Sequence, residues 1–128
     1  MTAPLIQAES LAKVYPGIQP VTAVDHLSFT INEGEFMSIV GSSGSGKSSL
    51  MNILGLLDSP SSGSLKYHGE DIAQWNEKRR AAFRNQQIGF IFQAHMLLPE
   101  FNALENVLMP ARIGKTYNTQ AIEQAKTL

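Results

Sequence analysis

The alternation of hydrophobic and polar residues predicts an antiparallel hairpin near the start of the chain. Residues 24–31 place Leu27, Phe29 and Ile31 on one side of an extended chain and polar side chains on the other. This period of two is typical of a strand with one buried and one exposed face. A fainter strand pattern covers residues 4–15, and the turn-forming sequence PGIQP separates the two segments. We therefore expect an antiparallel β subdomain here.

Two short runs are apolar almost without interruption and predict strands of a different kind. They are residues 36–40 (FMSIV) and 88–92 (IGFIF), the second of which ends at polar Gln93. Strands that are buried on both faces, as in a parallel sheet, have this composition. The other predicted elements are a helix through residues 50–54, a turn cluster at 58–64, a short strand at 65–67, a helix at 76–87 and a last helix from Asn118 or Thr119. Together these elements indicate an α/β fold.

Composition and charge narrow the classes of partner. The 128 residues are 43% hydrophobic and 16% charged, with a net charge of -1, so no general positive field favours nucleic acid. The helix at 76–87 has a basic face, which single helices usually expose to solvent. There is no Cys, and no segment approaches the roughly 18 apolar residues of a membrane span. We expect no nucleic-acid partner, and we expect any link to a membrane to go through another protein.

A Gly-rich segment lies between the first apolar run and the first predicted helix. Its sequence GSSGSGKS, Gly41 to Ser48, matches the phosphate-binding pattern G-x-x-x-x-G-K-[ST] at every fixed position. Glycines let the backbone turn sharply, and the N–H groups of such a loop form a concave site for phosphate at a helix N-terminus. A flexible linker is the alternative, but a linker needs neither Lys-Ser at its end nor an apolar helix after it. The pattern therefore predicts nucleotide binding.

The motif assigns roles to its residues. Lys47 would contact the β- and γ-phosphates, and the Ser48 hydroxyl would bind Mg²⁺. Ser49 would make a second phosphate contact or a packing contact. The predicted phosphate-binding set is Gly41, Ser42, Ser43, Gly44, Ser45, Gly46, Lys47, Ser48 and Ser49.

Residues beyond the loop distinguish among P-loop proteins. The order of Gly-rich loop, apolar helix, SPSSG turn, basic helix and the segment IGFIFQAHMLLPEFNALENV resembles the ATP-binding subunits of ABC transporters across essentially the whole chain. It is most similar to the branch that contains the ATPases of the lipoprotein-releasing system and of the macrolide exporter, and closer to the former. The resemblance implies that Tyr15 stacks on adenine. It also implies that Gln93 is the catalytic Q-loop glutamine, which helps to order Mg²⁺ and the attacking water.

Tyr15 and Gln93 have plainer interpretations when they are taken without the family. Tyr15 would be an amphipathic residue that packs at a strand end. Gln93 would be a solvated cap of a strand, because Gln is mostly exposed in proteins.

The chain departs from the family pattern in several places. Asn102 stands where the family usually has Thr, yet with Glu105 it keeps the residue pair that caps a helix. The sequence ILGLLD, ending at Asp58, imitates a Walker B strand, but we place it in the helix after the loop, facing away from a nucleotide, and no Glu follows it. His95 is a loop residue rather than the switch histidine of the family, and no LSGGQ signature is present.

These features lead to one expectation for the fold. Residues 1–128 would be the N-terminal part of a single ABC nucleotide-binding domain that lacks the signature, the Walker B motif, the catalytic Glu and the switch His. The fold class would be an incomplete α/β P-loop NTPase core with an N-terminal antiparallel β subdomain.

The implied function is coupling of ATP binding and hydrolysis to export, with lipoprotein release first and a macrolide-type or other exporter as the alternative. The complete protein would be an ATPase, whereas residues 1–128 alone would not be catalytically competent. The cofactors would be ATP and Mg²⁺. The partners would be integral-membrane permease subunits and a second nucleotide-binding subunit, at the cytoplasmic face of the inner membrane. Two other classes share the loop: a P-loop small-molecule kinase, whose acceptor site nothing after Ile88 resembles, and a non-catalytic nucleotide-binding module.

A concentrated apolar group follows the second apolar run. It consists of Met96, Leu97, Leu98 and Phe101, and the resemblance places it where a coupling helix of the permease docks. The alternative is that these side chains pack beneath their own loop. We refer to these four residues as the apolar loop group.

Overall fold

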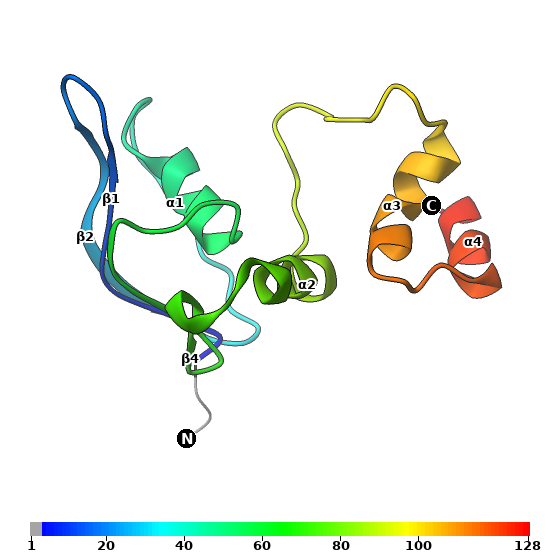
Figure 1. Cartoon of the computed structure of the whole chain (residues 1–128), viewed down its shortest axis with the longest axis horizontal. Coiled ribbons are helices and arrows are strands. Elements are labelled where there is room, and N and C mark those ends of the chain that lie inside the picture. Colours follow the sequence, from blue (N-terminus) through cyan, green and yellow to red (C-terminus); the bar gives the residue numbers. More distant parts are fainter. Residues whose placement is uncertain (1–3) are drawn as a thin grey trace. The chain divides into compact units, whose positions relative to one another are not determined.

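A computed structural model describes residues 4–128 of the chain. By their internal contacts the residues divide into two compact units, Met1–Arg80 and Ala81–Leu128. The first unit contains a sheet and a helix, and the second is built from helices and loops (Figure 1).

The sheet of the first unit is entirely antiparallel. Its strands are β1 (Ile6–Tyr15), β2 (Val21–Ile31), β3 (Ser62–Tyr67) and β4 (Glu70–Asp71), in the spatial order β2-β1-β3-β4. The β1–β2 hairpin pairs Ala8 with Phe29, and on its other side β1 pairs Ala8 with Leu65. The predicted antiparallel subdomain is confirmed. Leu27, on the face of β2 that was predicted to be buried, is nevertheless 42% exposed, and Val24 is the buried residue of that strand.

Helix α1 (Lys47–Leu54) packs against this sheet. Leu50 and Ile53, three residues apart on one helix face, are buried with Leu11 and Leu65 of the sheet. Tyr67 is also buried, and its hydroxyl donates a hydrogen bond to the Leu54 carbonyl at the end of α1. Burial raises the pKa of the Tyr67 hydroxyl, so this donor stays protonated. The core therefore fixes the helix that starts at the Gly-rich loop.

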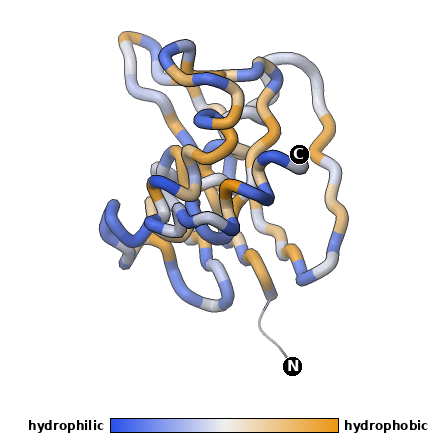
Figure 2. Tube along the Cα trace, turned by 90° about the vertical axis from the view of Figure 1, so that its right-hand side faces the viewer, coloured by the Kyte–Doolittle hydropathy of each residue, from blue (hydrophilic) through white to orange (hydrophobic). Residues whose placement is uncertain are grey.

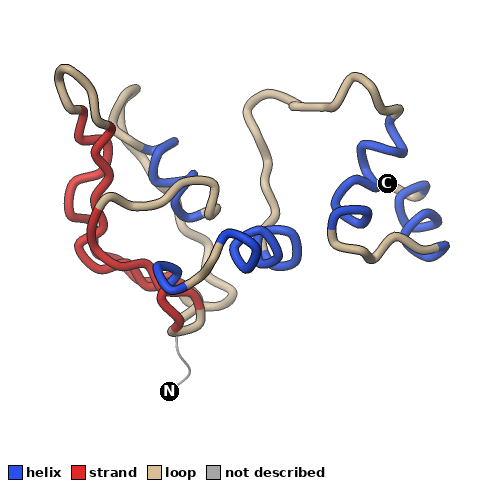
Figure 3. Tube along the Cα trace, in the orientation of Figure 1, coloured by secondary structure: helices blue, strands red, loops and turns tan. Residues whose placement is uncertain are grey.

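The two predicted buried strands are wrong in this structure. Residues 36–40 and 88–92 form no strand (Figure 3). Phe36 and Ile91 are 92% and 104% exposed, and orange hydrophobic stretches appear in loop parts of the trace as well as in regular elements (Figure 2). The physical reason is pairing: a buried strand needs hydrogen-bonded neighbours, and among the described residues neither segment pairs with a strand of the sheet. The Phe90 and Phe92 rings nevertheless stack at 5.4 Å, as alternate side chains of an extended segment do.

Helices make up the remaining elements. They are the 3-10 helix η1 (Ile72–Gln74), α2 (Glu77–Gln87), α3 (Ala103–Ile113) and α4 (Thr119–Lys126). The predicted cap of α3 is confirmed: Asn102 Oδ1 accepts from Glu105 N at 2.9 Å, and the Glu105 carboxylate accepts from Asn102 N. Asn118 caps α4 with one bond of this kind, in which its Oδ1 accepts from Ala121 N at 2.9 Å. Within residues 4–128 no helix has the length and apolarity needed to cross a membrane.

The basic residues of α2 are not a uniform solvated face. Arg79 pairs with Glu70 and lies over the Trp75 ring. Arg80 donates to Ser59 Oγ at 2.6 Å and to the Ile72 carbonyl at 3.0 Å. These arginines therefore contact neighbouring residues of their own unit rather than solvent alone.

Candidate functional site

The Gly-rich loop turns directly into α1, and Gly46 makes that turn possible. Gly46 is the N-cap of the helix with φ 88°, a conformation that costs other residues free energy. An added Cβ there would lie 1.8 Å from the carbonyl oxygen of Ala23 on β2. The last glycine of the motif is therefore required both by its backbone angle and by its close approach to the sheet.

The N-terminus of α1 is suited to an anion. Gly46 gives the helix no side-chain cap, and its first turn contains no acidic residue. The first N–H groups of a helix have no acceptor within the helix, and the helix dipole adds partial positive charge there. This end of α1 therefore presents donors and positive potential without a neutralising carboxylate.

Lys47 adds a full positive charge to the loop. Its Nζ donates to the carbonyls of Gly41 at 2.8 Å and Ser42 at 2.7 Å, and lies 3.3 Å from Ser45 Oγ. These contacts fold the ammonium group back across the loop. Phosphate oxygens accept charge-assisted hydrogen bonds that are stronger than those to neutral carbonyls. The Lys47 ammonium could therefore donate to a bound phosphate in place of these carbonyls.

Tyr15 and the loop border one pocket in the first unit, with a volume of about 600 Å³. It brings together seven of the predicted site residues with two residues of β2. The lining is Tyr15, Val21, Ala23, Ser43, Gly44, Gly46, Lys47, Ser48 and Ser49. Lys47 is its charged member, and no carboxylate lines it among the described residues. A pocket lined by an aromatic ring and a cationic loop has the chemistry to hold an aromatic base and its phosphates.

Three other predicted residues make hydrogen bonds within the loop: Gly41, Ser42 and Ser45. Gly41 and Ser42 supply the carbonyls that hold Lys47, and Ser45 N donates to the Ser42 carbonyl at 3.2 Å. Gln93 belongs to the second unit, where it is an exposed loop residue, and its predicted role stays a prediction.

A contact network around Tyr15 escaped the sequence analysis. The Tyr15 hydroxyl lies 3.2 Å from Asp58 Oδ2 and 3.3 Å from Ser49 Oγ, and Lys13 Nζ lies 2.6 Å from Asp58 Oδ1. The Lys13 ammonium lowers the pKa of the Asp58 carboxyl, with further help from the Ser59 N–H and the Tyr15 hydroxyl against the opposing effect of burial. Asp58 is therefore ionised at neutral pH.

Our placement of Asp58 needs correction. Helix α1 ends at Leu54 with Gly55 as its cap, so Asp58 lies in the turn beyond the helix, where it contacts Tyr15. One sequence signal pointed to Lys13: it stands two residues before Tyr15 on β1, and such residues share a face of a strand. No local pattern could pair Asp58 with residues more than forty positions earlier.

The described residues can also be compared with the ligands that Mg²⁺ requires. No group of three His, Asp or Glu side chains within residues 4–128 is arranged to hold a metal ion. Mg²⁺ usually keeps several waters and is bound through one or two protein groups together with substrate phosphates. The exposed Ser48 hydroxyl on the pocket wall fits that kind of site.

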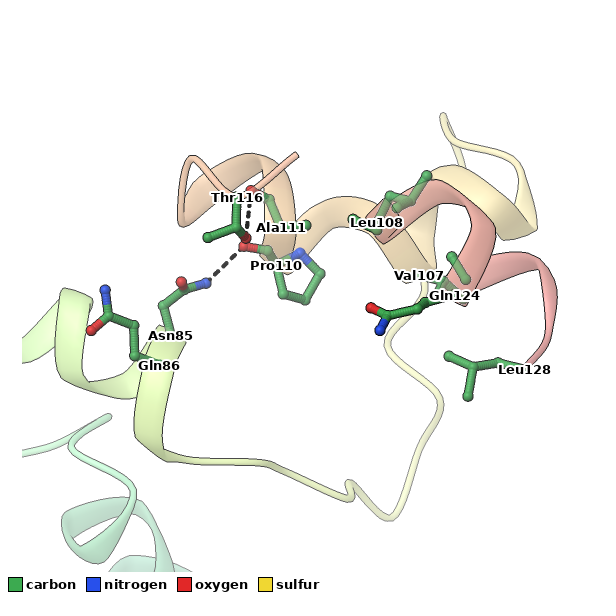
Figure 4. A pocket seen from close by; sticks show the side chains of 11 residues that line it. Asn85, Gln86, Val107, Leu108, Pro110, Ala111, Thr116, Gln124 and Leu128 are labelled. Atoms are coloured by element: carbon green, nitrogen blue, oxygen red, sulfur yellow. Dashed lines mark hydrogen bonds between the residues drawn. The ribbon is translucent and has the colours of Figure 1, made fainter. Parts of the chain in front are cut away.

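A second pocket lies within residues 81–128 and has different chemistry. Its volume is about 400 Å³, and it lies between α2, α3 and α4 (Figure 4). Small, apolar and amide side chains line it without any charged group, and Asn85 Nδ2 donates to the Pro110 carbonyl at 2.9 Å (Figure 4). This pocket therefore offers a phosphate no positively charged side chain.

The apolar loop group in the second unit is exposed rather than packed. Leu97 is 62% exposed and Phe101 is 36% exposed. The backbone of this loop is held by Asn106, which accepts from Leu98 N at 2.9 Å and donates to the carbonyls of Leu98 and Phe101. A fixed backbone with exposed apolar side chains is typical of a docking surface.

Comparison with known proteins identifies the family. The family model described as "ABC transporter" matches residues 24–128. The chain belongs to the ABC transporter family. This membership confirms the predicted family and sets aside the small-molecule kinase.

Among curated proteins, the ABC transporter chain is similar to lipoprotein-releasing system ATP-binding proteins LolD. It is 48% identical to the protein of Cytophaga hutchinsonii over 124 residues, which are 97% of this chain and 55% of that protein. It is 47% identical to the protein of Bordetella pertussis over 126 residues, covering 98% of this chain and 54% of that protein. The chain thus spans about half the length of these relatives.

Among solved structures, the chain is similar to an ATP-binding cassette, MJ0796. A dimeric post-hydrolysis state of that cassette, bound to ADP and Pi, has a TM-score of 0.87 and 32% identity. This match covers 95% of this chain and 54% of that chain. The likeness confirms the predicted fold class, an incomplete ABC ATPase fold with an N-terminal antiparallel sheet.

Proposed function

We propose that this chain is the nucleotide-binding part of the ATPase subunit of an ABC transporter. The observation that supports it most is the pocket in which Tyr15, Lys47 and the N-terminus of α1 meet. A nucleotide bound in this pocket would place its base at Tyr15 and its phosphates at residues 41–49, where Lys47 would contact the β- and γ-phosphates. Family membership and the ADP-bound relative support ATP as the nucleotide.

Mg²⁺ accompanies ATP in this proposal. Ser48 would hold it from the loop, and Gln93 would be a second ligand, as the family resemblance implies. When bound, Mg²⁺ neutralises phosphate charge and polarises the terminal phosphate. The chain's own residues bind and orient the phosphates, and Gln93 helps to position the attacking water.

The complete protein would use ATP hydrolysis to drive export. The names of its LolD relatives support lipoprotein release as the process, with a macrolide-type or other exporter as the alternative. A second nucleotide-binding subunit is a proposed partner because the solved relatives are dimeric. Integral-membrane permease subunits are the other partners, which would hold the protein peripherally at the cytoplasmic face of the inner membrane.

Residues 1–128 are proposed to be the N-terminal part of a single nucleotide-binding domain. No carboxylate lines the pocket in the described residues, so the pocket positions phosphates without supplying a general base. On this view residues 1–128 bind nucleotide, and hydrolysis belongs to the complete protein.

The first prediction tests nucleotide binding through Lys47. In the full-length protein Lys47→Ala should weaken MgATP binding by at least about a hundredfold, because a charged group that contacts two phosphates is lost. Isothermal titration calorimetry measures the affinity, and circular dichroism verifies that the variant is folded. Lys78→Ala is the matched control, since Lys78 is an exposed lysine of α2 outside the pocket. Wild-type affinity in the folded Lys47→Ala protein would refute the proposed site.

A further inference from the structure

Tyr15 is held at its hydroxyl by two different segments. It stands at the end of β1, and its hydroxyl lies 3.2 Å from Asp58 Oδ2 and 3.3 Å from Ser49 Oγ. A phenol has one proton and an ionised carboxylate can only accept, so that proton is directed to Asp58. Ser49 belongs to α1, two residues after Lys47. The ring is therefore tied both to the turn after α1 and to the helix that begins at the phosphate loop.

Lys13 holds the same ring from one face. Its Nζ lies 5.0 Å from the centroid of the Tyr15 ring, a distance suited to a cation–π contact. The same ammonium lies 2.6 Å from Asp58 Oδ1 and 2.8 Å from the Ser59 carbonyl. The Lys13 and Asp58 side chains are only 12% and 31% exposed, so water screens this pair less than an open surface pair.

These contacts leave one ring face for a ligand. Lys13 occupies one face, the hydroxyl is tethered at the ring edge, and Tyr15 lines the pocket. A free Tyr side chain explores several rotamers and loses that freedom when a base stacks on it. A ring that is already fixed avoids most of this cost.

We propose that Lys13 and Asp58 are positioning residues that hold the Tyr15 ring ready for the nucleotide base. The inference rests on the proposed nucleotide binding. Neither residue lines the pocket, so both act through Tyr15 rather than by touching the ligand. Ser49 of α1 contacts the Tyr15 hydroxyl, whereas Lys47 is held within the phosphate loop by the carbonyls of Gly41 and Ser42. The contacts that hold the ring are therefore separate from those that shape the phosphate loop. A purely structural role is the competing explanation, and it predicts a different response to ligands without a base.

The test compares a ligand with a base to a ligand without one. Calorimetry on the full-length protein measures the affinities of MgATP and of magnesium tripolyphosphate. Tyr15→Phe keeps the stacking ring but removes the tether, and Asp58→Asn keeps the shape of the side chain but removes its charge. Each should weaken MgATP binding by about three- to tenfold, the cost of ordering one freed side chain on binding, and should leave tripolyphosphate affinity unchanged.

Double substitution and matched controls sharpen this test. Tyr15→Phe with Asp58→Asn should weaken MgATP binding by less than the product of the two single effects, because both changes act on the shared contact between Tyr15 and Asp58. Asp25→Asn and Tyr117→Phe are controls of the same chemistry at exposed positions outside the pocket, and both should bind like wild type.

Each result has a defined meaning. Unchanged MgATP affinity in Tyr15→Phe and Asp58→Asn would overturn the positioning role. An equal loss for MgATP and tripolyphosphate would also overturn it, since it would show general damage to the first unit. If the wild-type protein bound neither ligand, or if Lys47→Ala bound both normally, the proposed nucleotide site would itself fail and the inference with it.

Discussion

Gly46 shows how a single residue sets the geometry of the phosphate loop. The sequence pattern requires glycine at this position, and the structure gives two separate reasons. The backbone has φ 88°, and the Ala23 carbonyl oxygen on β2 occupies the space that a Cβ would need. Gly44 also has a positive φ, of 79°, but open space surrounds its missing Cβ. Comparing Gly44 with Gly46 therefore separates two free-energy costs of adding a side chain: that of the positive backbone angle, and that of the close approach to Ala23.

Substituting these two glycines gives a matched prediction. Gly44→Ala should lower the free energy of unfolding by about 1 kcal/mol, the approximate cost of the left-handed conformation. Gly46→Ala should lower it by at least about 3 kcal/mol, because the loop must also move away from β2. Urea denaturation of the full-length protein measures both. Equal losses would show that the approach to Ala23 does not constrain the loop.

At the scale of elements, local patterns predicted the parts that are stabilised by local contacts. The β1–β2 hairpin follows from alternation and a turn sequence, and the caps of α3 and α4 follow from Asn residues that bond within three positions. The segments 36–40 and 88–92 were predicted as strands from composition alone. An apolar composition indicates that a segment is suited to burial. A strand of a sheet also requires a neighbouring strand to which it can hydrogen-bond. This second condition is non-local and was not available from the sequence.

The same limit applied to the candidate site. The loop and its ligand chemistry could be predicted because residues 41–49 are contiguous and each has a fixed offset. Tyr15 could be assigned only through the family resemblance, since β1 and the loop meet through tertiary packing. The contact between Asp58 and Tyr15 spans 43 positions, so the local sequence around Asp58 could not predict it. Long-range side-chain pairs of this kind have no sequence period to reveal them.

The exposed apolar loop group gives a prediction at the element scale. In the full-length protein, replacing Leu97 and Phe101 by Ser should reduce permease association at least about tenfold and lower export, because both residues are apolar anchors of the proposed docking surface. MgATP affinity should stay near wild type, since neither residue belongs to the nucleotide pocket. Co-purification with the permease and calorimetry measure the two effects.

Substitution of Ile113 and Tyr117 by Ser is the control for that experiment, because these exposed apolar residues lie outside the apolar loop group. This control protein should bind the permease normally. If the Leu97 and Phe101 variant also bound and drove the permease normally, the docking surface would lie elsewhere.

At the scale of the whole molecule, the two pockets assign different chemistry to the two units. The first unit has a cationic loop, a helix N-terminus and an aromatic ring around one space. The second has an uncharged pocket and an exposed apolar loop group. This division agrees with a protein that binds nucleotide through one part and a membrane partner through another, which is the central proposal for this member of the ABC transporter family.

The most direct test of that proposal is a map of the amide resonances that move when nucleotide binds. Nuclear magnetic resonance spectra of the ¹⁵N-labelled full-length protein, titrated with MgADP, report every backbone N–H separately. The largest shifts are expected at Gly44 to Ser49, with a smaller shift at Tyr15 and little change at residues that line the second pocket, such as Val107 and Gln124. No shift in the loop at saturating MgADP, or the largest shifts around the second pocket, would contradict the proposal.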